Sequence, residues 1–214
     1  MTPTMWIALL GTFLVAVMSP GPDFLAVLRI SLSSNRRAGR MGAAGIAAGT
    51  VLWIIATMVG IVALINSHPT TSLIIRLIGA GFLTAYGAHI VLTTLRSGPE
   101  DPQATDLAAP SHYSPARAFR LGLLTTTVGN PKAVVFYTAF FATLLPPGMG
   151  ISESLLLGIA MVLISFSWFA FVATVASNRA FIRGYERLHR PIDIILGALF
   201  IALGIALFPW SRLF

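Results

Sequence analysis

Residues 6–33 read WIALLGTFLVAVMSPGPDFLAVLRISLS, an apolar run that is interrupted near its middle by Ser19–Asp23 (SPGPD). A transmembrane helix needs about 20 apolar residues to cross about 30 Å of hydrocarbon, so this run is long enough to span a bilayer. Proline removes a backbone donor and frees carbonyl groups, which lipid cannot hydrogen-bond. We therefore predict a membrane span that is broken near mid-membrane, where the break is buried in protein or lines a water-filled cavity.

A second apolar run carries the same kind of break. Residues 118–145 are interrupted at Gly129–Lys132 (GNPK), and Pro131 follows Pro22 by 109 residues, about half of the 214-residue chain. An ionisable residue follows each proline directly, Asp23 in the first run and Lys132 in the second. Interrupted segments at corresponding positions of two halves are typical of the central site of a transporter.

The composition predicts an all-α integral membrane protein. The chain is 56% hydrophobic and only 10% charged, whereas soluble domains carry about 25% charged residues. Strand alternation is absent, so the spans are expected to be helices. Hydropathy and helix breakers predict six of them, at residues 6–33, 42–65, 73–95, 118–145, 155–176 and 192–207. Three spans in each half force the halves to be inverted, which gives a first three-helix repeat (1–95), a cytoplasmic linker (96–116) and a second three-helix repeat (117–214).

The arginines predict the orientation of the chain in the membrane. They cluster after the first span, around the linker and between the fifth and sixth spans, at Arg36, Arg37, Arg40, Arg96, Arg117, Arg120, Arg179, Arg183, Arg187 and Arg190. Connections rich in arginine stay in the cytoplasm. We therefore expect both termini to lie outside, and a net charge of +7 then reflects these loops rather than binding to nucleic acid.

Two charges near the breaks are the strongest candidates for a binding site. Lys132 is the only lysine, and Asp23 is the only acidic residue among the first 99. Each charge costs at least about 2.5–3.5 kcal/mol in the bilayer centre unless it is paired or hydrated. The two could form a buried ion pair that only pins the first span against the fourth. They also complement a zwitterion: Asp23 takes an ammonium group or a proton, and Lys132 takes a carboxylate.

The backbone around Lys132 favours the second interpretation. Asn130 can cap the second half of the fourth span, and Pro131 suits the first position of a helix. The N–H groups exposed there would attract a carboxylate. A free amino acid carries both charges on one carbon, so a pocket with both complements is a suitable receptor for it.

These motifs resemble the LysE/RhtB family of amino-acid exporters. The resemblance covers essentially the whole chain and rests on SPGPD at Ser19–Asp23, the glycine-rich residues 39–49, and GNPKA at residues 129–133, in that order. It implies efflux of amino acids or close derivatives across a bacterial inner membrane, driven by the proton gradient, by a multi-pass protein without a cofactor. The residues carried over to a substrate site are Pro20, Gly21, Pro22, Asp23, Asn130, Pro131 and Lys132.

Other functions fit the sequence less well. The absence of cysteine excludes thiol chemistry, and scattered histidines without an acidic cluster predict no metal site and no enzyme. Export of another solute or a metal cation remains the alternative, although a lysine beside the one acid disfavours a multivalent cation. Arg76 and Asp193, near the starts of the third and sixth spans, are interpreted as interfacial anchors. Small-residue helix faces serve folding and self-association alike, so a homo-oligomer stays open.

Overall fold

The chain was analysed as a computed structural model that describes residues 2–65, 69–96, 112–130, 132–133, 136–137, 140, 149–176 and 178–208. Within these ranges the protein is all-helical and has no strand, as its composition predicts. The helices are α1 (Pro3–Met18), α2 (Pro22–Ser33), α3 (Arg36–Ile65), α4 (Pro69–Arg96), α5 (Pro115–Leu124), α7 (Ile151–Val175) and α8 (Arg179–Leu207). A π-helical turn, η1 (Thr125–Gly129), follows α5.

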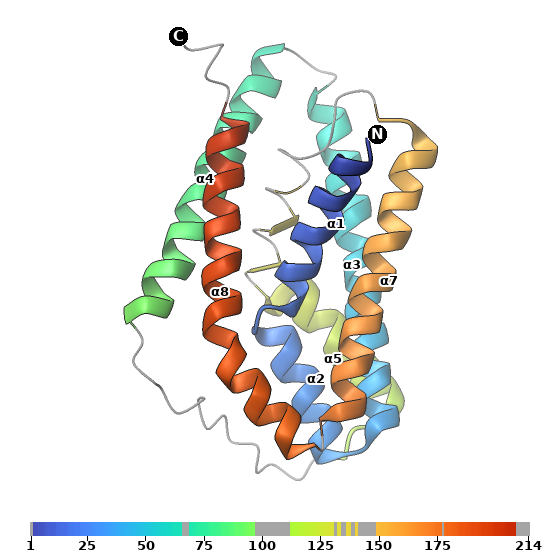
Figure 1. Ribbon diagram of the computed structural model, residues 1–214. Helices are drawn as coiled ribbons and strands as arrows, with labels where there is room; N and C mark the ends of the chain where they lie inside the picture. The colour runs from blue at the N-terminus through green and yellow to red at the C-terminus, as the bar shows by residue number, and fades with distance from the viewer. Residues whose placement is uncertain are drawn as a thin grey trace.

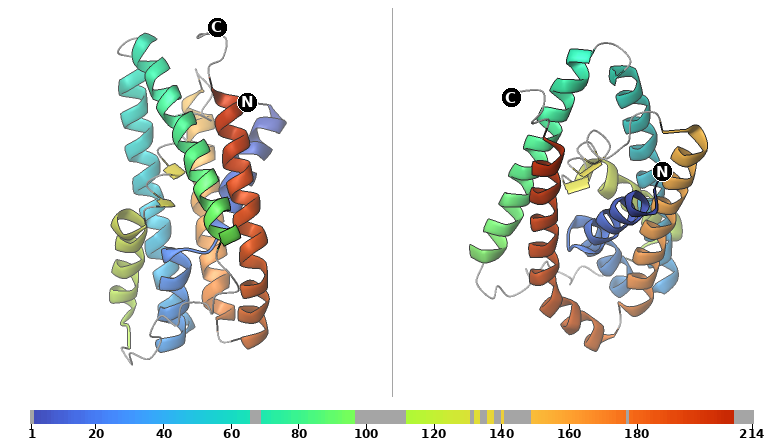
Figure 2. Two further views of the ribbon diagram at one scale, coloured as in Figure 1. Left: turned by 90° about the vertical axis from the view of Figure 1, so that its left-hand side faces the viewer. Right: turned by 45° about the horizontal axis from the view of Figure 1, so that its top comes forward.

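The helices run along one common direction and alternate in sense. In Figure 1, α1 begins and α8 ends at one end of the bundle, whereas α2 and α7 end, and α3, α5 and α8 begin, at the opposite end. Figure 2 shows α4 and α8 side by side as an antiparallel pair, and this pair is the most extensive helix–helix contact of the described residues. The helix starts that carry the arginine clusters therefore lie together at one end. The side of the membrane that this end faces stays a prediction.

Four helices contain segments that are long and apolar enough to cross a membrane, namely Arg36–Met58, Leu77–Arg96, Ile151–Val175 and Arg187–Ala206. The pair α1 and α2 forms a fifth segment that is bent by 52° at its break. The broken first span is thus present as predicted. The predicted fourth span begins with α5 and η1, and most of it beyond Asn130 lies outside the described residues. The six-span inverted repeat therefore stays a prediction.

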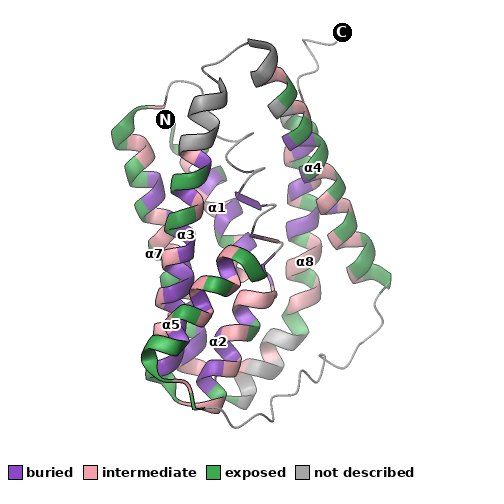
Figure 3. Ribbon diagram, turned by 180° about the vertical axis from the view of Figure 1, so that it is seen from behind, coloured by how far each residue is buried: buried purple, intermediate pink, exposed green. Residues whose placement is uncertain are grey.

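The outer faces of the bundle are apolar and exposed. In Figure 3 the buried residues face the interior, while α4, α7 and α8 present exposed residues outward. These include Ile78 and Phe82 of α4, Leu155 and Leu163 of α7, and Ile195 of α8. Apolar surface of this extent is unfavourable in water and natural in lipid. The chain is accordingly a membrane protein.

The close contact between α3 and α5 depends on glycine. A Cβ atom at Gly45 of α3 would overlap the carbonyl oxygen of Phe119, and one at Gly122 of α5 would overlap that of Gly42. The backbones of α3 and α5 therefore touch directly. Since α3 also packs on α2 and α7, it holds both halves of the chain together at the level of the break.

Candidate functional site

The candidate site lies at the break of the first span, between α1 and α2. At a rise of about 1.5 Å per residue, α1 with 16 residues and α2 with 12 residues are about 24 Å and 18 Å long, so the break lies near the middle of the bent segment. The chain leaves α1 at Ser19, whose N–H donates to Val15 O over 3.0 Å. It re-enters a helix at Pro22, the first residue of α2, where the missing N–H has no intrahelical partner to lose.

Lys132 caps the open end of α1. Its ammonium group donates to the carbonyl oxygens of Ser19 over 2.8 Å, Ala16 over 3.2 Å and Pro20 over 3.4 Å. A helix C-terminus leaves such carbonyls unpaired, and an ammonium group has three donors, so the two match in number. A Cβ atom at Gly21 would lie 3.3 Å from Nζ. Gly21 therefore keeps open the space that the lysine occupies.

Asp23 is held from the other broken span. Asn130 Nδ2 donates to Asp23 Oδ2 over 2.9 Å, and Asn130 Oδ1 accepts from the Ala133 N–H over 3.2 Å. The second bond is the helix cap that the sequence suggested for Asn130. Asp23 Oδ1 is buried and accepts no hydrogen bond from the described residues. The Thr126 hydroxyl group lies near this carboxylate, and its oxygen is likewise buried without a hydrogen bond to the described residues.

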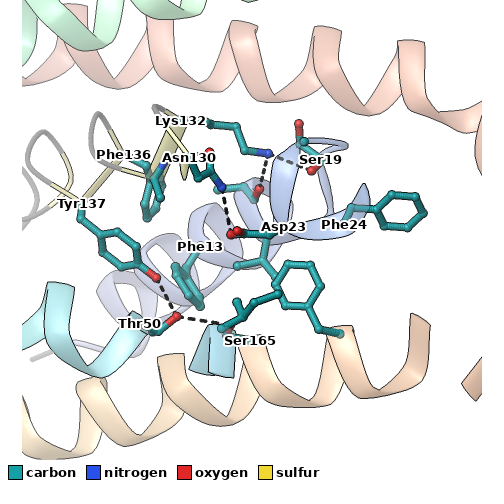
Figure 4. A pocket seen from close by; sticks show the side chains of 16 residues that line it. Phe13, Ser19, Asp23, Phe24, Thr50, Asn130, Lys132, Phe136, Tyr137 and Ser165 are labelled. Atoms are coloured by element: carbon teal, nitrogen blue, oxygen red, sulfur yellow. Dashed lines mark hydrogen bonds between the residues drawn. The ribbon is translucent and has the colours of Figure 1, made fainter. Parts of the chain in front are cut away.

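Both predicted charges line one cavity of about 40 Å³ (Figure 4). It is bordered by side chains from α1, α2, α3 and α7 and from the residues after η1, including Phe13, Ser19, Gly21, Asp23, Phe24, Ile46, Thr50, Asn130, Lys132, Phe136, Tyr137, Ser165 and Phe169. One water needs about 10–15 Å³ on this scale, so the space suits a few waters. A larger solute requires the cavity to widen.

The two charges do not form a direct ion pair in the described structure. The Lys132 donors are all directed at backbone carbonyls, and Asp23 takes its hydrogen bond from Asn130. Both line the same cavity, so opposite charges there attract each other without direct contact. A direct ion pair is therefore not what joins the first span to the fourth in the described residues; the bonds of Lys132 and Asn130 join them instead. Within the described residues, the Asp23 carboxylate keeps one oxygen atom, Oδ1, that accepts no hydrogen bond.

The opposite wall of the cavity is formed by hydroxyl groups and aromatic rings. Tyr137 OH donates to Thr50 Oγ1 over 3.1 Å, and Thr50 Oγ1 donates to Ser165 Oγ over 3.3 Å. Trp53 stacks on Tyr137 with ring centroids 5.9 Å apart, and its Nε1 donates to the Thr126 carbonyl in η1 over 3.0 Å. Trp53 thus satisfies a carbonyl of the π-helical turn. The sequence gives no signal for Thr50 or Ser165, because lone hydroxyl residues are common in membrane helices.

Asp193 is a correction to the sequence interpretation. The sequence predicts an interfacial anchor, but Asp193 Oδ1 accepts a hydrogen bond from Ser19 Oγ over 2.6 Å. The carboxylate therefore reaches the break itself. The anchor interpretation is wrong because this carboxylate contacts the break. The sequence could not show the contact, since Ser19 and Asp193 are 174 residues apart and only the packing of α1 against α8 brings them together.

Of the three prolines predicted for the site, the structure describes Pro20 and Pro22 but not Pro131. Pro20 contributes a carbonyl to Lys132, and Pro22 begins α2. Among the residues that the structure describes, no group of three or more His, Cys, Asp or Glu side chains could hold a metal ion.

Comparison with known proteins identifies the family. The LysE type translocator family model matches residues 14–209, which is nearly the whole chain and includes both breaks. The chain belongs to the LysE type translocator family. It is therefore a membrane transporter and not an enzyme.

This LysE-type translocator resembles two groups of curated relatives. It is 31% identical over 198 residues to the threonine efflux protein of Salmonella typhi, covering 91% of this chain and 92% of the relative. It is 30% identical over 196 residues to the threonine efflux protein of Escherichia coli (strain K12), with the same coverage of 91% and 92%. It is 29% identical over 203 residues to the leucine efflux protein of Salmonella choleraesuis, covering 92% and 90%. No solved structure matches the chain.

Proposed function

We propose that this protein exports amino acids, with the cavity at the helix break as the substrate site. The observation that carries the proposal is Asp23 Oδ1, a buried carboxylate oxygen at the cavity wall without a hydrogen bond from the described residues. An ammonium group supplies both the charge and the donor that this atom lacks. Relatives named for the efflux of threonine and leucine support an amino acid as the source of that group.

Recognition of the substrate carboxylate involves Lys132 in this proposal. Its three donors are occupied by the end of α1, so a substrate carboxylate has to compete with those carbonyls. Taking Lys132 away from α1 leaves the helix end uncapped. Substrate binding would thereby loosen the hinge between α1 and α2, which already bends by 52°. The capped N-terminus at Asn130 offers further attraction for the carboxylate.

The substrate side chain would face the hydroxyl and aromatic wall. The described lining on this side, which includes Phe13, Thr50, Phe136, Tyr137 and Ser165, is uncharged. A charged side chain would lose its hydration there without gaining a partner. We therefore expect small neutral amino acids, with hydroxyl or aliphatic side chains, rather than basic or acidic ones.

The six-span inverted repeat is part of the same proposal. In an inverted repeat, the first span (α1 and α2) would correspond to the broken fourth span, α3 to α7, and α4 to α8. Each of the last two helices of a half then packs on its own counterpart, α3 on α7 and α4 on α8. The contact of α3 with α5 likewise corresponds to that of α7 with α1. Such reciprocal pairing is what a half-turn about an axis in the membrane plane requires. Together with the antiparallel course of α4 and α8 (Figure 2), it supports inverted halves.

Export would be driven by proton entry across a bacterial inner membrane. The relatives are bacterial efflux proteins, and the arginine-rich helix starts lie at one end of the bundle (Figure 1). By the positive-inside rule that end faces the cytoplasm and both termini face outward. A carboxylate inside the membrane is a suitable proton carrier.

Transport into inverted membrane vesicles tests this function. Vesicles are supplied with the twenty amino acids, homoserine or Mn²⁺, with and without an imposed pH gradient that is acidic inside. We expect accumulation of a neutral amino acid that depends on the gradient and is absent from vesicles without the protein. Accumulation of Mn²⁺ but of no amino acid would refute amino-acid export and favour the cation alternative.

A further inference from the structure

A second intramembrane carboxylate lies next to the proposed site but is not among the residues that line the cavity. Asp193 belongs to the apolar segment Arg187–Ala206 of α8 and is half-buried. Its Oδ1 accepts the Ser19 hydroxyl hydrogen over 2.6 Å. Ser19 in turn lines the cavity. The carboxylate is therefore fixed at the depth of the helix break.

Ser19 connects Asp193 to Lys132. While its hydroxyl group donates to Asp193, its carbonyl oxygen accepts from Lys132 Nζ over 2.8 Å. The Lys132 ammonium group interacts electrostatically with both Asp193 and Asp23. The other titratable groups that act on Asp193, or on which it acts, are His189, one turn earlier on α8, and Tyr86 of α4.

The charges at the break do not balance. Among the described residues at the break, two carboxylates and one ammonium group leave one net negative charge inside the membrane when all three are ionised, which is costly in lipid. A proton or a cation relieves this cost. A cation in the cavity reaches Asp23, whereas a proton on Asp193 leaves the cavity unoccupied, because Asp193 is not among the residues that line it.

We propose that Asp193 is a proton-binding site of the transport cycle, separate from the substrate cavity, and that a proton there opposes the binding of an ammonium group at Asp23. This inference rests on the proposed function and adds the residue that couples it to protons. With Asp193 protonated, Lys132 balances Asp23, and the cavity attracts an ammonium group weakly. With Asp193 ionised, Lys132 is shared between two carboxylates, and the ammonium group of the substrate is attracted to Asp23.

Linkage makes this opposition reciprocal, so substrate binding also favours release of the proton from Asp193. The proton enters from water on the outer side, forms an O–H bond with the carboxylate, and leaves to cytoplasmic water when substrate binds. The protonated, empty form is neutral, whereas the form with a zwitterionic amino acid and ionised Asp193 carries one negative charge. A membrane potential that is negative inside therefore drives the loaded form outward.

The test uses the purified protein in proteoliposomes with radiolabelled L-threonine and two measurements. The first is exchange of external for internal threonine without a pH gradient, and the second is accumulation driven by an imposed pH gradient. We expect Asp193→Asn, which resembles the protonated form, to keep exchange at saturating threonine with a raised KM, but to lose at least tenfold in accumulation. Asp193→Glu, which keeps an ionisable group, should recover accumulation. Glu153→Gln, which removes a carboxylate from the first turn of α7, is the matched control and should change neither measurement.

Several outcomes would overturn the proposal. Accumulation by Asp193→Asn at the wild-type level would show that the proton binds elsewhere, with Asp23 as the remaining carboxylate of the site. Loss of exchange at saturating threonine, as well as of accumulation, in a correctly inserted Asp193→Asn protein would place Asp193 in substrate binding or folding. If Asp193→Asn does not insert into the membrane, the pH dependence of threonine accumulation by Asp193→Glu tests the proposal instead. A shift of the half-maximal pH by about 0.4 units towards alkaline supports the proposal, because a glutamate carboxyl group is the weaker acid, and an unchanged profile contradicts it. Failure of the wild-type protein to exchange any amino acid would instead refute the proposed function itself.

Discussion

Replacing Asp23 by asparagine separates the charge of this residue from its shape. Asn130 Nδ2 donates to Asp23 Oδ2 over 2.9 Å, and an asparagine side-chain oxygen can accept that bond in the same place. Its NH₂ group then occupies the position of Oδ1, the buried oxygen that accepts no hydrogen bond from the described residues. An acceptor for an ammonium group is thus exchanged for a donor, while the contact between the two broken spans is kept.

The magnitude follows from the lost interaction. A hydrogen bond to a charged partner contributes about 1.5–3 kcal/mol, and 1.36 kcal/mol corresponds to tenfold. We therefore expect the KM for threonine exchange in proteoliposomes to rise about 10- to 150-fold in Asp23→Asn. The thermal unfolding midpoint in detergent should stay within about 3 °C of the wild type, since the Asn130 contact persists. Glu153→Gln serves as the control for removal of a carboxylate. A KM within twofold of the wild type would show that Asp23 does not bind the substrate, and the proposed site would be wrong.

Three further predictions test the cap, the helix contact and the topology. Lys132→Met leaves three carbonyls without their donor, those of Ala16 in α1 and of Ser19 and Pro20 in the break, at about 1–3 kcal/mol each when buried. Both transport and the unfolding midpoint should therefore fall, and an unchanged midpoint would contradict the capping role. Gly122→Val places side-chain atoms on the Gly42 carbonyl and should reduce the amount of inserted protein severalfold on immunoblots of membranes, whereas a wild-type amount would mean that α3 and α5 can separate freely. A cysteine at Ser34 should be shielded from impermeant reagents in intact cells and one at Ser67 should be labelled, and the reverse pattern would invert the proposed orientation.

Much of the architecture could be predicted because the relevant physics is local. A proline in a long apolar run breaks a helix whatever surrounds it, and the SPGPD motif does so between α1 and α2. Asp23 and Lys132 stand out because a charge is expensive in lipid at any position along a span. The same rule led to the cavity that both residues line.

The partners of those charges could not be predicted, because they depend on distant parts of the chain. The lone lysine suggested a carboxylate as its partner, yet in the folded chain it donates to carbonyls 112–116 residues away. A backbone carbonyl is present in every residue and leaves no mark in a sequence. Only the position of the end of α1 relative to the fourth span selects which carbonyls Lys132 meets.

For Asp193, too, the sequence gives the place in the span, whereas only the packing of the helices gives the partner. From the sequence it is an acid near the start of a span, where a polar side chain can reach the interface. The approach of α8 to the end of α1 turns it toward Ser19 instead. The sequence alone thus determined that this chain lies in a membrane, that its first span is broken, and that two charges stand at the breaks, since each follows from the cost of placing a residue in lipid. The tertiary structure decided which groups balance those charges, because electrostatic and hydrogen-bond energies depend on distances of a few ångströms that only helix packing sets.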